Sequence, residues 1–168
     1  MSIEILPVLE EQKPVLGKLL EFYVYDFSEF AGFEVDEYGY YGYSHLDEYW
    51  TDQTRHPFFV KVDGKLAGFV LVFSLCDYIA NENAHSIAEF FIMRKYRRNH
   101  VGDYAARYVF DLFPGEWEVK VLHSNKSAQL FWQKVIDGYT KGKYTLHEEV
   151  IENWNGYGYT FQAPETLL

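Results

Sequence analysis

Apolar side chains recur at steps of three and four residues in three segments of the chain, which is the spacing of one face of a helix. The first segment predicts a helix over residues 10–30, and its apolar face is formed by Leu16, Leu19, Leu20, Tyr23, Phe27 and Phe30. The other two predict helices over residues 102–113 and 125–135, which Pro114-Gly115 and Asp137-Gly138 are expected to end. Residues 31–54 are rich in Gly and Tyr, and we expect a loop there with a short helix around residues 44–50.

Runs of β-branched and aromatic residues predict the strands. The clearest runs are residues 58–62 and 65–73, because the Asp63-Gly64 pair between them favours a type I′ hairpin turn. Further strands are predicted over residues 3–8, 86–93, 117–122, 143–152 and 157–162, with a turn at 153–156 before the last. This order of elements predicts a mixed α/β (α+β) domain in which helices cover a central sheet.

The composition is that of an ordinary globular protein. The 168 residues are expected to form one domain, and 48% of them are apolar and 24% charged. No apolar run is long enough to span a bilayer, and the first residues show no export signal. The one cysteine, Cys76, excludes an intrachain disulfide or a Cys-rich metal site. We therefore expect a cytoplasmic protein without a bound metal.

The charge is strongly negative and unevenly distributed. With 15 Lys and Arg against 25 Asp and Glu, the net charge is -10, so neither nucleic acid nor an anionic membrane is an expected partner. Residues 19–54 hold no Lys or Arg, whereas Arg94, Lys95, Arg97 and Arg98 lie close together. An acidic region and a compact basic spot predict two ligands, one cationic and one anionic.

The basic spot lies where a predicted strand ends and a predicted helix begins, at about Gly102. The first N–H groups of a helix have no partner within it and carry partial positive charge, which favours an anion. Gly102 lets backbone approach a phosphate closely, and Arg97 and Arg98 can add charge-assisted hydrogen bonds. A solvated basic turn is the plain alternative.

Two short motifs carry a family resemblance. One is Tyr96-Arg97-x-x-His100-x-Gly102, and the other runs from Asn125 through Ala128 to Trp132 and is followed by Gly138-Tyr139. They resemble two signatures of the GNAT superfamily of acyl-CoA-dependent N-acyltransferases. These are the pyrophosphate loop, (Arg/Gln)-x-x-Gly-x-(Gly/Ala), and the later Asn-x-x-Ala-x-x-(Phe/Leu)-Tyr followed by Gly-Phe. The order of elements matches too, so the resemblance covers nearly the whole chain.

The resemblance implies one N-acetyltransferase-like domain over residues 1–168, with acetyl-CoA as acyl donor. Its sheet would have about seven mixed, mostly antiparallel strands, flanked by about four helices and splayed around CoA. The pantetheine arm would lie along the backbone of Phe91, Ile92 and Met93, and Asn125 would hydrogen-bond it. The residues implied in binding CoA are Phe91, Ile92, Met93, Arg97, Arg98, Asn99, His100, Val101, Gly102, Asp103, Asn125, Ala128, Phe131 and Trp132.

Two residues depart from the family pattern. His100 stands where glycine is usual, so backbone donation requires a conformation there that a residue with a side chain can adopt. Trp132 stands where many members have the tyrosine that protonates the leaving thiolate, and an indole N–H cannot act as a general acid. That role is vacant, reassigned to Tyr139 or His123, or unnecessary because a CoA thiolate is already a good leaving group.

An amine nucleophile must lose a proton, and a carboxylate near the acetyl carbon is the common means in the family. Glu89, on the strand that leads to the basic loop, is the first candidate for this base. Asp26, Glu29 and Glu34 are the alternatives. The plain alternative for Glu89 is a solvent-facing residue of an alternating strand.

The acceptor is expected to bind the region around residues 23–50, where aromatic residues, 20% of the whole chain, alternate with carboxylates. Aromatic faces and carboxylates without a nearby Lys or Arg suit a cationic amine. Tyr23, Asp26, Glu29 and Glu34 are the candidates for binding it. The alternative is that these aromatics fill the core and the acids form a solvated face.

We therefore expect an N-acetyltransferase that moves an acetyl group from acetyl-CoA to the primary amine of a small cationic acceptor by direct attack. The alternative is a catalytically weak or inactive acyl-CoA-binding module of the same fold. The sequence does not name the acceptor, because a fold does not fix a substrate, and it leaves a homodimer open.

Overall fold

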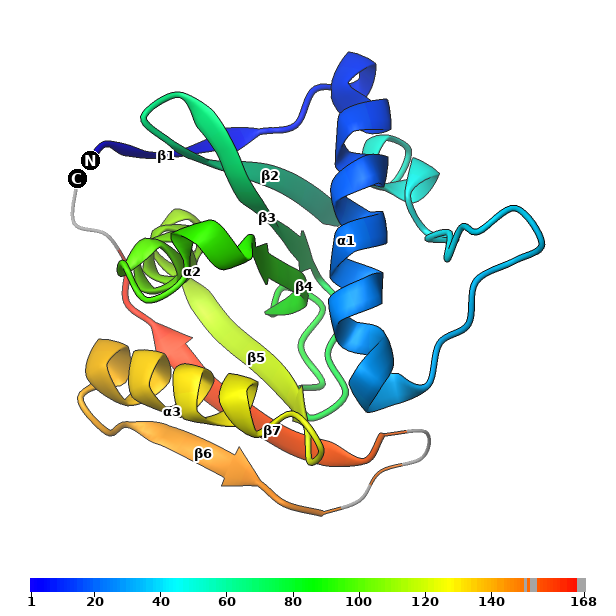
Figure 1. Ribbon diagram of the computed structural model, residues 1–168. Helices are drawn as coiled ribbons and strands as arrows, with labels where there is room; N and C mark the ends of the chain where they lie inside the picture. The colour runs from blue at the N-terminus through cyan, green and yellow to red at the C-terminus, as the bar shows by residue number, and fades with distance from the viewer. Residues whose placement is uncertain (150, 152–153, 166–168) are drawn as a thin grey trace. The chain divides into compact units, whose positions relative to one another are not determined.

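Figure 1 shows the computed structural model, which describes residues 1–149, 151 and 154–165. The chain forms two compact units. Unit 1 comprises Met1–Leu71 and Glu89–Val101, and unit 2 comprises Val72–Ala88 and Gly102–Leu168. The strands β3 (Lys65–Phe73) and β4 (His85–Ile92) contribute residues to both units. A single domain over residues 1–168 stays a prediction.

The described residues form a seven-stranded sheet with the order β1-β2-β3-β4-β5-β7-β6. Besides β3 and β4, its strands are β1 (Ile3–Pro7), β2 (Arg55–Val62), β5 (Gly115–Leu122), β6 (Tyr144–His147) and β7 (Gly156–Ala163). β4 pairs with β5 in parallel, whereas β1 with β2, β5 with β7, and β6 with β7 are antiparallel. The mixed seven-stranded sheet implied by the resemblance is confirmed.

The parallel pair is short. β4 and β5 are in register at only two positions, His85 with Trp117 and Ser86 with Glu118, whereas β5 and β7 pair along the full length of both strands. Beyond Ser86, no further register between β4 and β5 is found among the described residues.

In unit 1, helix α1 (Lys13–Ala31) follows a 3-10 helix at Glu10–Gln12, so the helix predicted over residues 10–30 is confirmed. Pro14 lies in its first turn, and Gly32, with φ 68°, ends it in a left-handed conformation. The helix packs on β3 and β4 through Tyr23, whose ring centroid lies 5.7 Å from that of Phe69 and 6.0 Å from that of Phe91.

The hairpin between β2 and β3 has the predicted turn. Asp63 and Gly64 have φ values of 48° and 73°, and a type I′ turn requires positive φ at both central residues. Further along β3, Gly68 faces the backbone of β4: a Cβ atom added there would lie 2.0 Å from the carbonyl oxygen of Phe91. The backbones of β3 and β4 can therefore approach only because this residue has no side chain.

The short helix expected around residues 44–50 is a single 3-10 turn at Asp47–Trp50. It ends where the Asp52 side chain accepts hydrogen bonds from the N–H and hydroxyl of Thr54, at 2.9 and 2.6 Å, which turns the chain toward β2. The described residues therefore contain three α-helices rather than about four.

In unit 2, helices α2 (Val101–Leu112) and α3 (Lys126–Thr140) pack on β5 and β7. Phe110 of α2 contacts Trp117 of β5 and Phe161 of β7, with 4.9 Å between ring centroids in each pair. Phe110 and Trp117 are fully buried, as the apolar face predicted for residues 102–113 requires.

The predicted end of the third helix at Asp137-Gly138 is wrong. α3 continues to Thr140, and Lys141 and Gly142, with φ values of 55° and 79°, then take left-handed conformations that end it. Gly138 serves packing instead, because a Cβ atom there would lie 2.9 Å from Nη2 of Arg107 on α2.

The strand predicted over residues 143–152 is also wrong in length, because β6 ends at His147. Two residues later the Glu149 carbonyl accepts the Tyr78 hydroxyl at 3.4 Å. Residues 150, 152 and 153, the last of which belongs to the predicted turn, lie outside the described residues.

Candidate functional site

A cavity of about 590 Å³ opens in unit 1. Its walls come from α1, the loop that follows α1, and β4. Most of the side chains lining it are aromatic, and the two charged ones are carboxylates. The lining residues are Tyr23, Val24, Phe27, Phe33, Glu34, Tyr41, Gly42, Tyr43, Ser44 and Glu89.

Glu89 is held in this cavity by two tyrosine hydroxyls. Tyr23 donates to Oε2 at 2.5 Å, and Tyr43 donates to Oε1 at 3.2 Å. Burial raises the pKa of the Glu89 carboxyl above its ordinary value, and the two hydrogen bonds act in the opposite sense. A carboxylate with a raised pKa is a stronger base, which is the property that proton removal from an amine requires.

The two tyrosines remain donors over a wide pH range. Burial, followed by the Glu89 charge, raises the pKa of both the Tyr23 and the Tyr43 hydroxyl. Both hydroxyls therefore stay protonated around neutral pH.

The other three predicted carboxylates lie in different settings. Asp26 does not line the cavity and instead binds Arg94 at 2.7 Å and Arg97 at 2.6 Å. Burial opposes its ionisation, but the two arginine hydrogen bonds outweigh this effect, and the pKa of Asp26 is lowered. Glu34 lines the cavity, and Glu29 is exposed on α1. Of the three, Glu34 is the one that the structure brings together with Glu89.

The basic loop after β4 is exposed and contains two left-handed residues. Arg98 and His100 have φ values of 64° and 60°. This small region of backbone space is open to residues with side chains, and histidine is enriched there. His100 therefore adopts a left-handed conformation that a residue with a side chain can take, and α2 begins immediately after it, at Val101.

The Arg97 side chain folds back over β4. Its Nε donates to the carbonyl of Ile92 at 2.7 Å, and its guanidinium lies 5.7 Å from the centre of the Phe91 ring. The N–H of Met93 donates to the carbonyl of Ala67 at 2.8 Å. Two of the backbone groups expected to face pantetheine therefore already have partners within unit 1.

The remaining predicted CoA residues lie in α2 and α3, except for Asn99, which lies in the exposed loop, and Asn125, which immediately precedes α3. Gly102 and Asp103 are in the first turn of α2, where Asp103 accepts Nε of Arg107 at 3.0 and 3.1 Å. Asn125 caps α3, since its Oδ1 accepts the N–H of Ala128 at 3.0 Å. On the same helix Trp132 is buried, and its ring meets that of Phe131 at 4.9 Å.

The two candidate proton donors differ in their contacts. The Tyr139 hydroxyl donates to Asp111 at 2.7 Å, and burial, followed by this hydrogen bond, raises its pKa. Nδ1 of His123 lies 3.0 Å from Oδ1 of Asn155. Its Nε2 is buried and has no hydrogen-bond partner among the described residues. Tyr139 thus joins α3 to α2, while His123 keeps one ring nitrogen available.

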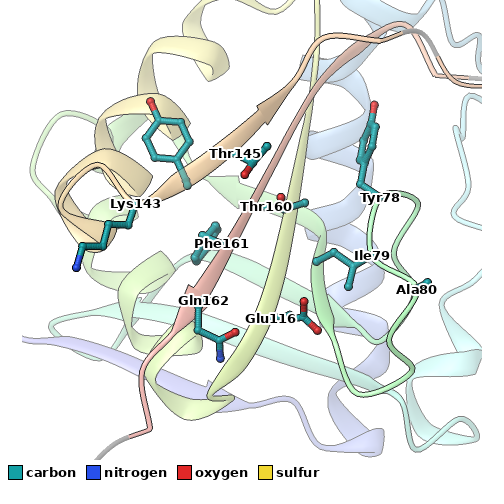
Figure 2. Close-up of a pocket in the computed structure, with 10 residues that line it drawn as sticks. Tyr78, Ile79, Ala80, Glu116, Lys143, Thr145, Thr160, Phe161 and Gln162 are labelled. Atoms are coloured by element: carbon teal, nitrogen blue, oxygen red, sulfur yellow. The ribbon is translucent and has the colours of Figure 1, made fainter.

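A second cavity, of about 620 Å³, lies in unit 2, where Figure 2 shows residues from the segment before β4 and from β5, β6 and β7 around it. Its polar lining includes one carboxylate and one ammonium group. The lining residues are Tyr78, Ile79, Ala80, Glu116, Lys143, Tyr144, Thr145, Thr160, Phe161 and Gln162. None of them is a predicted site residue.

Within the described ranges, no group of three or more His, Cys, Asp or Glu side chains is placed to hold a metal ion. In the same ranges, no helix has the length and apolar character needed to cross a membrane.

Sequence reasoning missed four aromatic residues that line the unit 1 cavity: Phe27, Phe33, Tyr41 and Tyr43. They lie in or beside the aromatic-rich region expected to bind the acceptor, but no local pattern separates them from the exposed tyrosines. The contact of Tyr43 with Glu89 joins positions 46 residues apart, so only the folded chain shows it.

Comparisons with known proteins give one family and many similar folds. The model of the acetyltransferase (GNAT) family matches residues 19–137. No curated protein matches the sequence significantly. An acetyltransferase from Thermus thermophilus has a TM-score of 0.68 at 15% identity, covering 96% of this chain and 97% of that chain.

Two other solved structures are similar to the same extent. The PaiA N-acetyltransferase of Thermoplasma acidophilum, in complex with coenzyme A, has a TM-score of 0.65 at 14% identity, with 96% and 99% of the two chains covered. An aminoglycoside acetyltransferase from an uncultured soil metagenomic sample has a TM-score of 0.63 at 16% identity, with 90% and 94% covered. At these identities the likeness concerns the fold.

Proposed function

The chain belongs to the GNAT acetyltransferase family, and we propose that it moves an acetyl group from acetyl-CoA to the primary amine of a small cationic acceptor by direct attack. The observation that supports this most directly is the cavity of unit 1. Its aromatic walls and its two carboxylates, Glu34 and Glu89, match the requirements of an ammonium group.

Charge in the surrounding segment favours the same class of acceptor. In the part of the chain that the structure describes, the residues that line the cavity include no Lys or Arg, and none occurs in the sequence between residues 19 and 54. The nearest arginines of the basic loop, Arg94 and Arg97, are paired with Asp26. A cationic amine entering the cavity therefore meets carboxylates without competition from a lining cation.

Glu89 is the proposed base. The acceptor amine must be neutral to attack, so a proton passes from its nitrogen to the Glu89 carboxylate, directly or through water. The nitrogen lone pair then forms the new bond to the acetyl carbon. The carbon–sulfur bond breaks, and its electron pair leaves with the CoA sulfur as a thiolate. The nitrogen, positively charged after the attack, releases its second proton to water or to the thiolate, which leaves a neutral amide.

Residues of the basic loop fit the anionic part of CoA. Arg98 is exposed, and the left-handed turns at Arg98 and His100 lead into the free N–H groups at the start of α2. Acetyl-CoA supplies the activated acetyl group when bound. Arg97 and the backbone of residues 98–103 would hold the pyrophosphate, and Phe91, Ile92, Met93, Asn125, Ala128, Phe131 and Trp132 the rest of the donor.

Protonation of the leaving thiolate has two candidate donors. Because the Tyr139 hydroxyl is committed to Asp111, His123 is the better placed of the two to exchange a proton. Its Nε2 becomes a donor when the imidazole is protonated.

A binding module without turnover is the second candidate function. The observation that favours it is Trp132, a buried indole at the position where many members of the family carry an acidic hydroxyl. Such a module would bind acetyl-CoA and release no thiol.

The test is release of free CoA thiol from acetyl-CoA in the presence of polyamines, aminoglycosides, amino acids and peptides. A matched pair of acceptors tests the preference for positive charge. A diamine and the amino alcohol of the same chain length carry the same reacting amine but differ by one positive charge. We expect turnover with a lower KM for the diamine. Equal KM values would contradict a cationic acceptor, and binding of acetyl-CoA without any turnover would favour the module.

A further inference from the structure

We infer that Tyr23 and Tyr43 are positioning residues for Glu89. The hydroxyls of the two tyrosines keep the Glu89 carboxylate ionised and orient it to accept a proton in the acceptor cavity. This inference rests on the proposed function, since Glu89 is the proposed base. It explains why these two positions are tyrosines, since phenylalanine would serve equally well if the lining only had to be aromatic.

The two hydroxyls come from different elements and bind different oxygens. Tyr23 lies on α1 and donates to Oε2, while Tyr43 lies in the loop after α1 and donates to Oε1. Two donors on two oxygens fix the plane of the carboxylate. Each oxygen can accept about two hydrogen bonds, so one acceptor position on each oxygen stays available for an acceptor proton.

Among the described residues, no Lys or Arg forms an ion pair with Glu89. No cation of this kind therefore stabilises the ionised carboxylate in place of the hydroxyls. The charged and titratable groups around Glu89 are Tyr23, Tyr43 and Tyr49, the His45 imidazole, and Glu34 across the cavity. The two hydroxyls are therefore the main groups that offset its burial.

Tyr43 also links Glu89 to the loop after α1, to which Tyr43 belongs. The Glu21 carboxylate on α1 accepts the N–H groups of Tyr41 and Gly42, at 2.9 and 2.8 Å. These bonds fasten the loop next to Tyr43, and so the second donor to Glu89 depends on how this segment sits on α1.

The sign of the effect follows from these contacts. Replacing a donor hydroxyl by hydrogen leaves Glu89 buried and removes stabilisation of its charged form, so its pKa rises further. The base is then protonated over more of the pH range, and the acid limb of the kcat/KM profile moves to higher pH. The 2.5 Å bond from Tyr23 predicts a larger shift than the 3.2 Å bond from Tyr43.

The experiment compares Tyr23→Phe and Tyr43→Phe with Tyr25→Phe and Tyr40→Phe. The controls lie on the same helix and the same loop, and their rings are 64% and 61% exposed. The Glu89 carboxyl is titrated by carbon-13 NMR in the free protein, and the kcat/KM profile is measured with the best acceptor. We expect an upward shift of about one pH unit for Tyr23→Phe, a smaller one for Tyr43→Phe, and none for the controls.

Unchanged Glu89 titration in both cavity variants, or equal shifts in the controls, would overturn the inference. If Tyr23→Phe folds poorly, Tyr43→Phe decides alone. Failure of the proposed function has a different signature: Glu89→Gln would keep wild-type turnover while the NMR shifts of the tyrosine variants persisted.

Discussion

Glu89 and Glu118 are two carboxylates on adjacent strands of the sheet, and they accept hydrogen bonds from different kinds of donor. Glu118, on β5 in unit 2, is fully buried and accepts the backbone N–H groups of Asp77, at 3.1 and 3.0 Å, and Tyr78, at 2.7 Å. Glu89, on β4, lines a cavity, and within the described ranges the hydrogen bonds that it accepts come from side-chain hydroxyls. A backbone donor is fixed by the fold, whereas a hydroxyl can rotate when a ligand arrives.

The difference teaches how to separate a structural carboxylate from a candidate base. Both residues stand on strands, and neither forms an ion pair with a Lys or Arg in the described part of the chain. What distinguishes them is access, because a ligand can reach Glu89 and cannot reach Glu118. Changes at Glu89 should therefore affect turnover, and changes at Glu118 should affect folding.

The largest expected effect is that of Glu89→Gln, which keeps the size of the side chain but removes its basicity. We expect kcat to fall by about 10²–10⁴-fold at neutral pH, the usual contribution of general base catalysis. The loss of stability should be smaller than in Glu118→Gln, because a tyrosine hydroxyl can rotate to accept from the new amide group. In the wild-type protein activity should be lost as pH falls through the Glu89 pKa, which burial raises above its ordinary value. Steady-state kinetics from acidic to alkaline pH tests both kinetic points. Near-wild-type kcat in the variant would turn attention to Glu34.

Arg97→Ala tests the donor side of the same unit. If Arg97 holds the CoA pyrophosphate, the variant should bind CoA more weakly by about 1.5–3 kcal/mol, the range for a hydrogen bond to a charged group. Calorimetry with CoA measures this. The matched control is Asp26→Asn, which removes the carboxylate that pairs with Arg97 but keeps the guanidinium. Equal affinity of Arg97→Ala and wild type for CoA would remove Arg97 from the binding set.

Glu118→Gln tests the structural side of the comparison. An amide oxygen at the Oε2 position can still accept both N–H groups, but the NH2 group then stands at the Oε1 position, where it faces the N–H of Asp77 as donor against donor. We expect a loss of about 1–3 kcal/mol in the free energy of unfolding, measured in denaturant, and unchanged kcat per folded molecule. A selective loss of kcat without a loss of stability would refute the distinction between the two carboxylates.

Asn125→Ala has the smallest expected effect. As the N-cap of α3, Asn125 should contribute about 1 kcal/mol of stability. If it also hydrogen-bonds pantetheine, the KM for acetyl-CoA rises as well. Thermal melting with and without CoA separates the two roles: a lower melting temperature with unaltered CoA affinity leaves the cap alone.

Local sequence patterns predicted helices, strands and turns well where the conformation is determined by a few neighbouring residues. The apolar spacing in α1 and the Asp63-Gly64 turn are examples, because helix periodicity and positive φ are properties of neighbouring residues. Gly138 was misread for the opposite reason. Glycine commonly ends a helix, but here it makes room for Arg107 of another helix, and nothing next to it in the sequence shows that.

The candidate site was predicted in part for the same reason. Glu89 is a candidate because of its strand position and Tyr23 because of its aromatic ring in the acidic region, and the structure joins them in one hydrogen bond across 66 residues. Asp26 is a candidate because it is a carboxylate of the first helix, in the region expected to bind the acceptor, but its pairing with Arg94 and Arg97 depends on how α1 and the basic loop meet in unit 1. Tyr43 lies in the region expected to bind the acceptor, but nothing local distinguishes it from its neighbours, because its contact with Glu89 is of the same long-range kind.

Gly68 also limits which substitutions this sequence can accept. Any side chain at this position would drive its Cβ into the Phe91 carbonyl, and the strand that would have to yield is the one that carries Glu89. Gly39 and Gly42, by contrast, have open space where a Cβ would stand, and there it is a positive φ that favours glycine. In a library of all single substitutions, position 68 should therefore accept glycine alone, even though its own atoms take no part in the chemistry.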